Sequence, residues 1–232
     1  MSLKFYFHPL SSFCHKALIA LYENDVSFER VVVNLGDPKS RAEFQSVWPM
    51  AKFPVLRDEA QNCTVAESTT IIEYLDAHYP GGTRFVPSDT SRAWKSRMWD
   101  RVYDHYVHVP MQKIVGDSLR PADKTDAYGV EQAASLIRQS YDMIERTMET
   151  TDWAAGDEFG LADCAAAPAL FYASTVVPFG RSHRNLAAYF DRLLSRPSYA
   201  RVIDEAEPYF SLFPLKIKLQ NPRRNQDGRT KS

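Results

Sequence analysis

Residues 3–33 read LKFYFHPLSSFCHKALIALYENDVSFERVVV, and this stretch predicts two strands joined by a helix. Residues 3–7 are short, aromatic and soon followed by a proline, as in a buried strand. Residues 13–24 place apolar side chains at helical three- and four-residue steps, and the valine run that ends residues 28–33 favours a second strand. Two strands joined by a crossover helix are expected to be parallel in one sheet.

The next fifty residues complete a small α/β unit. A short helix is expected near residues 42–47, and the turn-like stretch 58–62 separates two short strands of a hairpin. A helix then starts at Ser68 and stops at Tyr79. The predicted order is βαβαββα, which is a small sheet packed by helices.

The rest of the chain is predicted to be all-α. Prolines and glycines cluster in residues 80–87, which indicates a linker. We therefore predict an N-terminal domain over 1–82, a linker over 83–90 and a helical domain over 91–232. Pro110 should kink the first long helix, and residues 161–174 are apolar all round, as in the buried helix of a bundle.

Composition limits the function classes. The chain has 232 residues and a net charge of −1, so no polyanionic partner or membrane surface is expected. Three scattered cysteines fit neither a disulfide framework nor a zinc site, and they favour a reducing compartment. With no signal peptide and no spanning run, we expect a cytoplasmic protein without membrane or nucleic-acid partners.

The C-terminal tail is locally basic. Six cations stand there against one acid, Asp227, and they are Lys216, Lys218, Arg223, Arg224, Arg229 and Lys231. Contact with nucleic acid is one interpretation of such a tail, and a solvated end is the preferred one.

Four short segments carry a family resemblance. They are SSFCHK (11–16), AKFPVL (51–56), AESTTIIEYL (66–75) and FGLAD (159–163). In this order, and over nearly its whole length, the chain resembles the cytosolic glutathione transferase superfamily, in its bacterial-type form with a serine at the catalytic position. The resemblance implies a thioredoxin-like N-terminal domain, an all-helical C-terminal domain, and glutathione as co-substrate in a detoxification reaction with a small hydrophobic electrophile.

The first segment places hydroxyl groups at the start of a helix. The family register, counted back from Lys16, puts Ser11 at the catalytic position, where a hydroxyl donor and the helix N-terminus stabilise a thiolate. Moving a thiol pKa from about 8.5 to below 7 requires roughly 2 kcal/mol. Plain N-capping by Ser11 and Ser12 is the alternative. Cys14 is interpreted as a small packed residue, with a redox role as the alternative.

The second and third segments are those that bind glutathione in the family. Phe53–Pro54 resembles a cis-proline turn whose backbone pairs with the cysteinyl part of the tripeptide, and Lys52 matches a position that reaches the glycyl carboxylate. Glu67 and Ser68 open a helix, where the acid would take the ammonium and the serine the α-carboxylate of the γ-glutamyl group. A surface charge and an N-cap are the alternatives for this pair.

The fourth segment is a helix start. Related proteins usually have Ser or Thr where this chain has Gly160, so only Asp163 is left to close a capping box by accepting from the Gly160 N–H.

The electrophile pocket is expected between the first domain and the kinked helix. We predict that Phe13, Tyr103 and Tyr106 line it; Met111 is a further candidate, and the possible lid residues are Tyr209, Phe210 and Phe213. Core packing is the alternative for each.

Three competing hypotheses remain. Asp100, Asp104 and His108 share a helix face that suits a divalent metal, although a solvated charged face is preferred and no metal is predicted. The fold also serves as a non-catalytic glutathione-binding module. A thiol–disulfide oxidoreductase using Cys14 is the third. The resemblance implies a homodimer as well, with Trp94 and Met98 at its interface.

Overall fold

The four-stranded sheet is built around β1 (Leu3–Phe7) in the computed structural model, which describes residues 2–215 and 217–225. β1 pairs in parallel with β2 (Glu29–Val32) and antiparallel with β3 (Val55–Asp58). β4 (Cys63–Ala66) pairs antiparallel with β3, so the strand order is β2-β1-β3-β4. The predicted parallel pair and hairpin are both confirmed.

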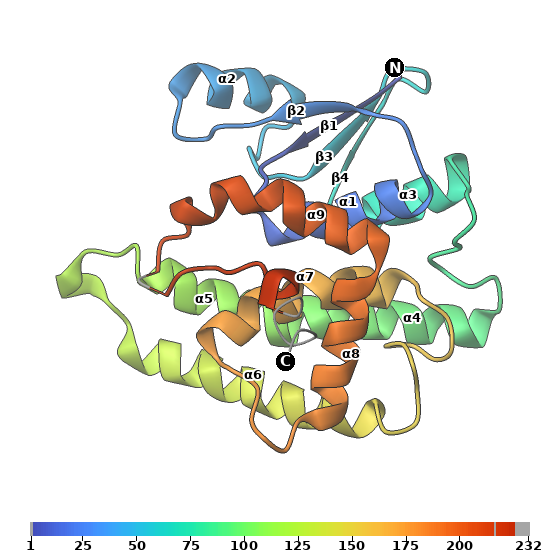
Figure 1. Cartoon of the computed structure of the whole chain (residues 1–232). Helices are drawn as coiled ribbons and strands as arrows, with labels where there is room; N and C mark the ends of the chain where they lie inside the picture. Colours follow the sequence, from blue (N-terminus) through green and yellow to red (C-terminus); the bar gives the residue numbers. More distant parts are fainter. Residues whose placement is uncertain (1, 216, 226–232) are drawn as a thin grey trace.

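Helices cover both faces of this sheet (Figure 1). They are α1 (Ser12–Glu23), α2 (Pro38–Val47) and α3 (Ser68–His78). Side chains alternate along β1: Leu3, Phe5 and Phe7 are buried in the core that α1 and α3 share, while Tyr6 stacks on Phe44 of α2 across the opposite face. In Figure 1, α1 and α3 lie between the sheet and the helical half of the chain.

The helix α2 starts four residues earlier than the sequence indicates. Asp37 caps it, because its Oδ2 accepts from the Ser40 N–H at 2.9 Å, and Pro38 occupies the first turn, where no intrahelical donor is needed. Only Phe44 of this helix is buried, so its first turn has no apolar periodicity to reveal it.

The second half of the described chain is helical, as predicted. Its helices are α4 (Thr90–Val102), the π-helical segment η1 (Tyr103–His108), α5 (Val109–Asp117), α6 (Ala127–Thr147), α7 (Leu161–Val176), α8 (Arg184–Ser195) and α9 (Pro197–Ala206), with short 3₁₀ turns η2 (Ala122–Lys124), η3 (Glu207–Leu212) and η4 (Pro222–Asn225). The chain therefore combines a thioredoxin-like α/β domain with an all-α domain.

The helix α7 is the centre of the helical domain. Every residue from Leu161 to Ala173 is buried, which confirms the prediction from its apolar sequence. The predicted partial capping box is also present, since Asp163 Oδ2 accepts from the Gly160 N–H at 2.9 Å. The other carboxylate oxygen accepts from the Ala154 N–H at 2.9 Å and from the Tyr189 hydroxyl at 2.6 Å. One carboxylate thus fixes the start of α7 and the loop before it.

Pro110 distorts the helix as expected, but the distortion lies one turn earlier. Pro110 has no N–H to donate to the carbonyl of Tyr106. The turn before it widens into η1, where the Val109 N–H donates to Asp104 five residues back. The hydroxyl of Ser140 on α6 lies 3.0 Å from the Tyr106 carbonyl and 2.8 Å from the Leu136 carbonyl, so it shares its one hydrogen between them and compensates in part for the lost hydrogen bond.

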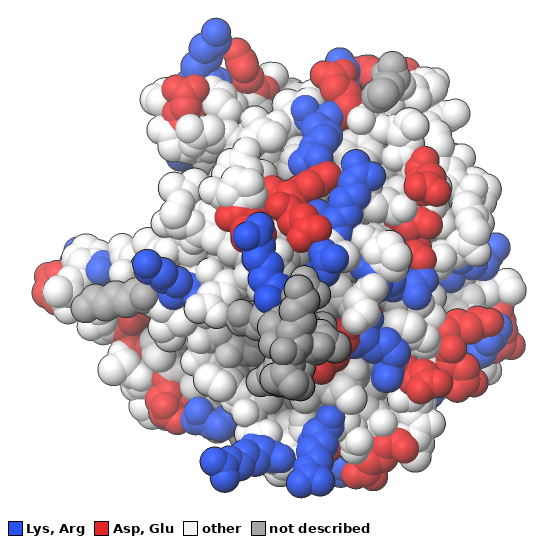
Figure 2. All heavy atoms as spheres, viewed as in Figure 1, with Lys and Arg blue, Asp and Glu red and all other residues white. Residues whose placement is uncertain are grey.

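Charges of both signs are interspersed on the face drawn in Figure 2. Part of the basic tail lies on this scaffold as ion pairs: Arg223 contacts Asp204 at 2.8 Å and Arg224 contacts Glu207 at 3.0 Å. These two arginines pair with acidic side chains of the helical domain and remain solvated, with 37% and 75% of their side-chain surface exposed. The tail cations Lys216, Arg229 and Lys231 lie outside the described residues.

No helix among residues 2–215 and 217–225 combines the length and apolar character needed to cross a membrane.

Candidate active site

The sheet topology brings three of the four predicted segments together at one end of the strands. β1 ends where β3 begins and β4 ends, because Tyr6 pairs with Val55 and Val55 pairs with Ala66. The residues just beyond these ends are the loop into α1, the Phe53–Pro54 turn and the start of α3. Segments 11–16, 51–56 and 66–75 therefore meet at one end of the sheet.

Ser11 is the N-cap residue of α1 and also faces open space. Its Oγ accepts from the Cys14 N–H at 3.3 Å, so the oxygen caps the helix. The hydroxyl hydrogen is not used by that contact, and Ser11 lines a mainly apolar cleft at this end of the sheet. The capping role and a donor role toward a ligand are thus compatible.

The neighbours of Ser11 point into the protein. Ser12 is buried, and its Oγ is hydrogen-bonded to Nε2 of His108 on η1. Phe13 stacks on the same imidazole, with ring centroids 3.9 Å apart and planes 18° apart. Cys14 is fully buried, and burial raises the pKa of its thiol to about 12. Of the three side chains that open α1, only Ser12 shares the cleft with Ser11.

The turn before β3 has the predicted cis bond between Phe53 and Pro54. Phe53 lines the cleft, and its ring lies 6.1 Å from that of His8 and nearly parallel to it. Pro54 is buried, whereas Lys52 is exposed beside it. The backbone of Phe53 is therefore presented at the sheet edge, with a cation one residue away.

Glu67 has an unusual backbone conformation. Its φ of 68° and ψ of 121° place a residue with a Cβ in a sparsely populated region, which costs about 1–3 kcal/mol. Its side chain is exposed and does not cap α3, whose first residue, Ser68, is buried. Strain of this kind is concentrated at ligand-binding sites. The start of α3 thus presents a carboxylate and free N–H groups next to each other.

The cleft has a volume of about 410 Å³. Its lining comes from the loop after β1, the start of α1, the turn before β3, the helices α5 and α7, and the segment after η3. The residues are His8, Leu10, Ser11, Ser12, Phe53, Met111, Gln112, Val115, Gly116, Tyr172, Phe213 and Pro214. These residues include no Lys, Arg, Asp or Glu. The cleft is accordingly suited to a mainly apolar molecule with few polar groups.

Three predicted pocket residues lie elsewhere. Phe13 packs on the buried imidazole of His108. Tyr103 has no exposed surface, and it lies inside the helical core beside Trp99. Tyr106 is 49% exposed and is not part of the cleft lining. The helical wall of the cleft lies one or two turns later than the sequence predicts, because the π-helical turn rotates the face that meets the first domain.

Residues after the kink form that wall instead. Met111 and Phe213, both further candidates from the sequence, do line the cleft. The residues that sequence analysis missed on α5 are Gln112, Val115 and Gly116. Their spacing from Met111 is one, four and five residues, which is one helix face and was readable as such. Tyr172 had no local signal, since it lies in the uniformly apolar α7.

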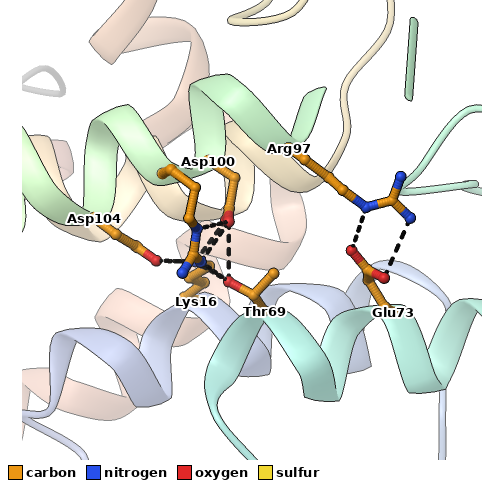
Figure 3. Close-up of polar contacts among 7 residues, drawn as sticks. Lys16, Thr69, Glu73, Arg97, Asp100 and Asp104 are labelled. Atoms are coloured by element: carbon orange, nitrogen blue, oxygen red, sulfur yellow. Dashed lines mark hydrogen bonds and ion pairs between the residues drawn. The ribbon is translucent and has the colours of Figure 1, made fainter. Parts of the chain in front are cut away.

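A buried ion cluster links α1 and α3 of the first domain to α4 and η1 of the second (Figure 3). Lys16 Nζ lies 2.6 Å from Asp100 Oδ1, 2.8 Å from Asp104 Oδ2 and 2.9 Å from Thr69 Oγ1. Arg101, half exposed, contacts both carboxylates. Burial raises the pKa of Asp104, and the nearby Lys16 opposes that rise.

This cluster explains the spacing that suggested a metal. The two carboxylates bind the ammonium group of Lys16, while His108 is directed to Ser12. Within residues 2–215 and 217–225, no three His, Cys, Asp or Glu side chains are grouped to hold a metal ion.

Comparisons with known proteins match both halves of the chain. Family models described as "Glutathione S-transferase, N-terminal domain" and "Glutathione S-transferase, C-terminal domain" match residues 5–83 and 102–197. Glutathione S-transferase 3 of Zea mays is 30% identical over 209 residues, which cover 87% of this chain and 93% of that protein. Glutathione S-transferase F13 of Arabidopsis thaliana is 26% identical over 210 residues, which cover 87% and 95%.

Solved structures agree on the fold. The crystal structure of a glutathione S-transferase from Methylobacillus flagellatus, with GSH bound, has a TM-score of 0.78 to this chain and is 23% identical, covering 87% of this chain and 98% of that one. Both domain types, in the same order, are thus found in sequence and in structure. The chain belongs to the cytosolic glutathione S-transferase superfamily and is a transferase of that family.

Proposed function

We propose that this chain activates glutathione as a thiolate and transfers it to a small hydrophobic electrophile. The observation that carries the proposal is the meeting of Ser11, the Phe53–Pro54 turn and the Glu67–Ser68 helix start at one sheet edge, beside an apolar cleft. Each of these three has a physical match to one part of the tripeptide.

The proposed binding mode runs along the sheet edge. The γ-glutamyl carboxylate takes the N-terminal N–H groups of α3 and the Ser68 hydroxyl, and the Glu67 carboxylate takes the ammonium group. The cysteinyl backbone pairs with the N–H and C=O of Phe53, as an added strand. Lys52, exposed beside that turn, neutralises the glycyl carboxylate.

Ser11 is the proposed catalytic residue. Its uncommitted hydroxyl hydrogen donates to the sulfur at the N-terminus of α1, and both effects favour the thiolate over the thiol. The electrophile then occupies the apolar cleft that Ser11 lines, in contact with Met111 and Phe213. Their apolar character supports an aryl or alkyl acceptor.

A thiol–disulfide reaction through Cys14 has less support. Its sulfur is fully enclosed in the core, and burial holds its pKa near 12, so the nucleophilic thiolate is scarce and has no access to a disulfide. A non-catalytic binding module would have no need for a Ser11 hydroxyl hydrogen that helix capping leaves unused.

Calorimetry and kinetics of three variants test the proposal. Glu67→Ala should weaken glutathione binding by about 1.5–3 kcal/mol, the usual scale for losing a hydrogen bond to a charged group. Ser11→Ala should leave binding nearly unchanged, raise the thiol pKa seen in thiolate absorbance, and lower turnover of a generic aryl halide about ten- to a thousandfold. Cys14→Ala is the matched control and should alter stability alone. Unchanged affinity in Glu67→Ala would refute the binding mode, and inactive Cys14→Ala beside active Ser11→Ala would refute the mechanism.

The active unit is proposed to be a homodimer in the cytoplasm, with a role in detoxification. Trp94 and Met98, one helical turn apart on α4, are 58% and 43% exposed and supply an apolar contact surface. Sedimentation at micromolar concentration should give twice the chain mass; a 26.5 kDa species alone would contradict the dimer. Cell fractionation tests the location.

A further inference from the structure

His8 is a polar side chain of the cleft that the proposed function leaves without a role. It directly follows β1, and its carbonyl accepts from the Ser11 N–H at 2.9 Å, so a tight turn holds it close to the proposed catalytic serine. Its ring packs between two aromatic side chains: that of Phe53, at 6.1 Å and nearly parallel, and that of Tyr209, edge-on at 6.0 Å. The imidazole is thus half-buried and fixed in orientation at the cleft wall.

The backbone selects the tautomer of this ring. The Leu10 N–H donates to His8 Nδ1 at 3.2 Å, so Nδ1 must carry its lone pair. In the neutral ring the proton therefore sits on Nε2. Protonating Nδ1 would break that hydrogen bond and oppose two N–H groups, and burial independently lowers the pKa of His8. His8 is therefore a neutral donor at pH 7, not a cation or a base.

Other hydroxyl groups of the cleft already have partners. The Tyr172 hydroxyl donates to the Leu10 carbonyl at 2.9 Å, and Ser12 is bonded to His108. Ser11 is assigned to the sulfur by the proposed function. Among the described residues, the Nε2–H of His8 has no recorded acceptor and belongs to a residue that lines the cleft. The Gln112 amide also lines the cleft, on the α5 side, whereas the His8 Nε2–H lies on the side of the proposed catalytic serine.

We propose that His8 determines specificity for electrophiles whose reaction places negative charge on an oxygen, for which an α,β-unsaturated ketone serves as the probe; this inference rests on the proposed function. The glutathione thiolate forms a bond to the β-carbon with a sulfur lone pair. The C=C π electrons move to make a new double bond to the carbonyl carbon, and the C=O π electrons move onto oxygen. His8 Nε2–H stabilises that enolate oxygen by a hydrogen bond, and water then gives a proton to the α-carbon and restores the ketone.

The donor acts on the transition state more than on the ground state. A neutral carbonyl oxygen accepts a weaker hydrogen bond than an enolate does, so His8 should increase the rate of addition more than the affinity for the ketone. A halide displacement forms no oxyanion, and it should gain nothing from the same donor.

A selectivity ratio tests this. The full-length wild-type chain and two variants are assayed with 4-phenylbut-3-en-2-one and with benzyl chloride, which are both small aryl electrophiles. His8→Phe keeps a ring between Phe53 and Tyr209 but removes the donor, so the ratio of kcat/KM for the ketone to that for the halide should fall about ten- to a hundredfold. His8→Gln, which retains an N–H donor, should keep a larger part of the ratio than His8→Phe.

The controls separate this inference from the proposed function. Glutathione affinity is measured by calorimetry for all three proteins, and thermal melts report their folding. An unchanged ratio in both variants would refute the role of His8 while leaving the transferase reaction in place. A wild-type chain that neither binds glutathione nor turns over either electrophile would refute the proposed function itself, and His8 selectivity with it.

Discussion

Replacing Lys16 with methionine should strongly destabilise the contact between the two domains. The ammonium group and both of its carboxylate partners, on Asp100 and Asp104, are withdrawn from solvent, with 0%, 0% and 6% of their side-chain surface exposed. Methionine retains the apolar stem of the lysine, so the substitution removes the charge and its hydrogen bonds and little packing. The two buried carboxylates would then depend on the half-exposed Arg101 and on the Thr69 hydroxyl, which donates to Asp100 Oδ2 at 3.0 Å.

The expected loss follows from the burial of the cluster. Removing one partner of a buried ion pair costs about 3–5 kcal/mol, mostly because the remaining charge is left uncompensated. Arg101 offsets part of this, so we expect about 3 kcal/mol for Lys16→Met. For a chain of this size each kcal/mol shifts Tm by about 2–4 °C, which gives a fall of about 6–12 °C.

Arg97→Met, on the helix α4 that also carries Asp100, is the matched control. Arg97 pairs with Glu73 at 2.7 Å and likewise joins α4 to the first domain, but both side chains are more than a third exposed (Figure 3). Such a surface pair contributes about 0–1 kcal/mol. Thermal melts of both variants, measured side by side, isolate the effect of burial.

The pH dependence gives a second check. Burial already raises the pKa of Asp104, and without the opposing charge of Lys16 that folded-state pKa should rise further, so the folded state binds more protons. The deficit of Lys16→Met relative to wild type should therefore shrink as pH falls from 8 to 5. Equal losses of about 1 kcal/mol or less for Lys16→Met and Arg97→Met would refute this reasoning.

Two further predictions concern stability. Gly160→Ser should cost about 1–3 kcal/mol in urea unfolding although serine is a good N-cap, because a Cβ there would lie 2.8 Å from the Phe85 carbonyl oxygen; a gain in stability would contradict the contact. Acid should destabilise the wild type, because burial lowers the pKa of His15 to about 4 and of His108 to about 3, so the unfolded chain binds more protons below pH 6.5. At about 1.4 kcal/mol per pH unit, each of the two histidines lowers the free energy of unfolding by about 2 kcal/mol at pH 5. Burial raises the pKa of Asp163 to about 6, and protonation of this carboxylate in the folded state raises the free energy of unfolding by about 1 kcal/mol. Urea midpoints at pH 7.5 and 5 measure the net loss, and His108→Gln should reduce it; a constant midpoint would argue against buried neutral imidazoles.

The sequence predicted most of the fold because its local signals agreed with its tertiary packing. The short aromatic run of residues 3–7 predicted a buried strand, and the helical steps of residues 13–24 predicted the helix that packs on it. The same holds for residues 161–174, which are apolar all round and buried all round. The start of α2 was missed because an exposed helix with one buried side chain has no periodic signal.

The cleft was only partly predictable. Ser11 and Phe53 belong to short segments that neighbouring residues alone identify, and both line the wall of the cleft in the structure. The helical wall depends on a π-helical turn, and a one-residue change in helical phase moves each side chain by about 100° around the axis. Tyr103 therefore turns into the core and Met111 into the cleft, which no single helical period predicts.

By itself, the sequence determined the order of strands and helices and the residue types available at each turn, because these depend on neighbours a few positions apart. Tertiary structure alone decided how each polar group is used. Lys16 contacts Asp104, 88 positions away, so the carboxylates that suggested a metal site form a buried ion pair instead. His108 contacts Ser12, 96 positions away, so the serine that suggested an N-cap forms a hydrogen bond between the domains. Packing of the two domains brings together side chains that are far apart in the chain. Burial then strengthens each such contact, because water cannot solvate a buried charge or donor that loses its partner.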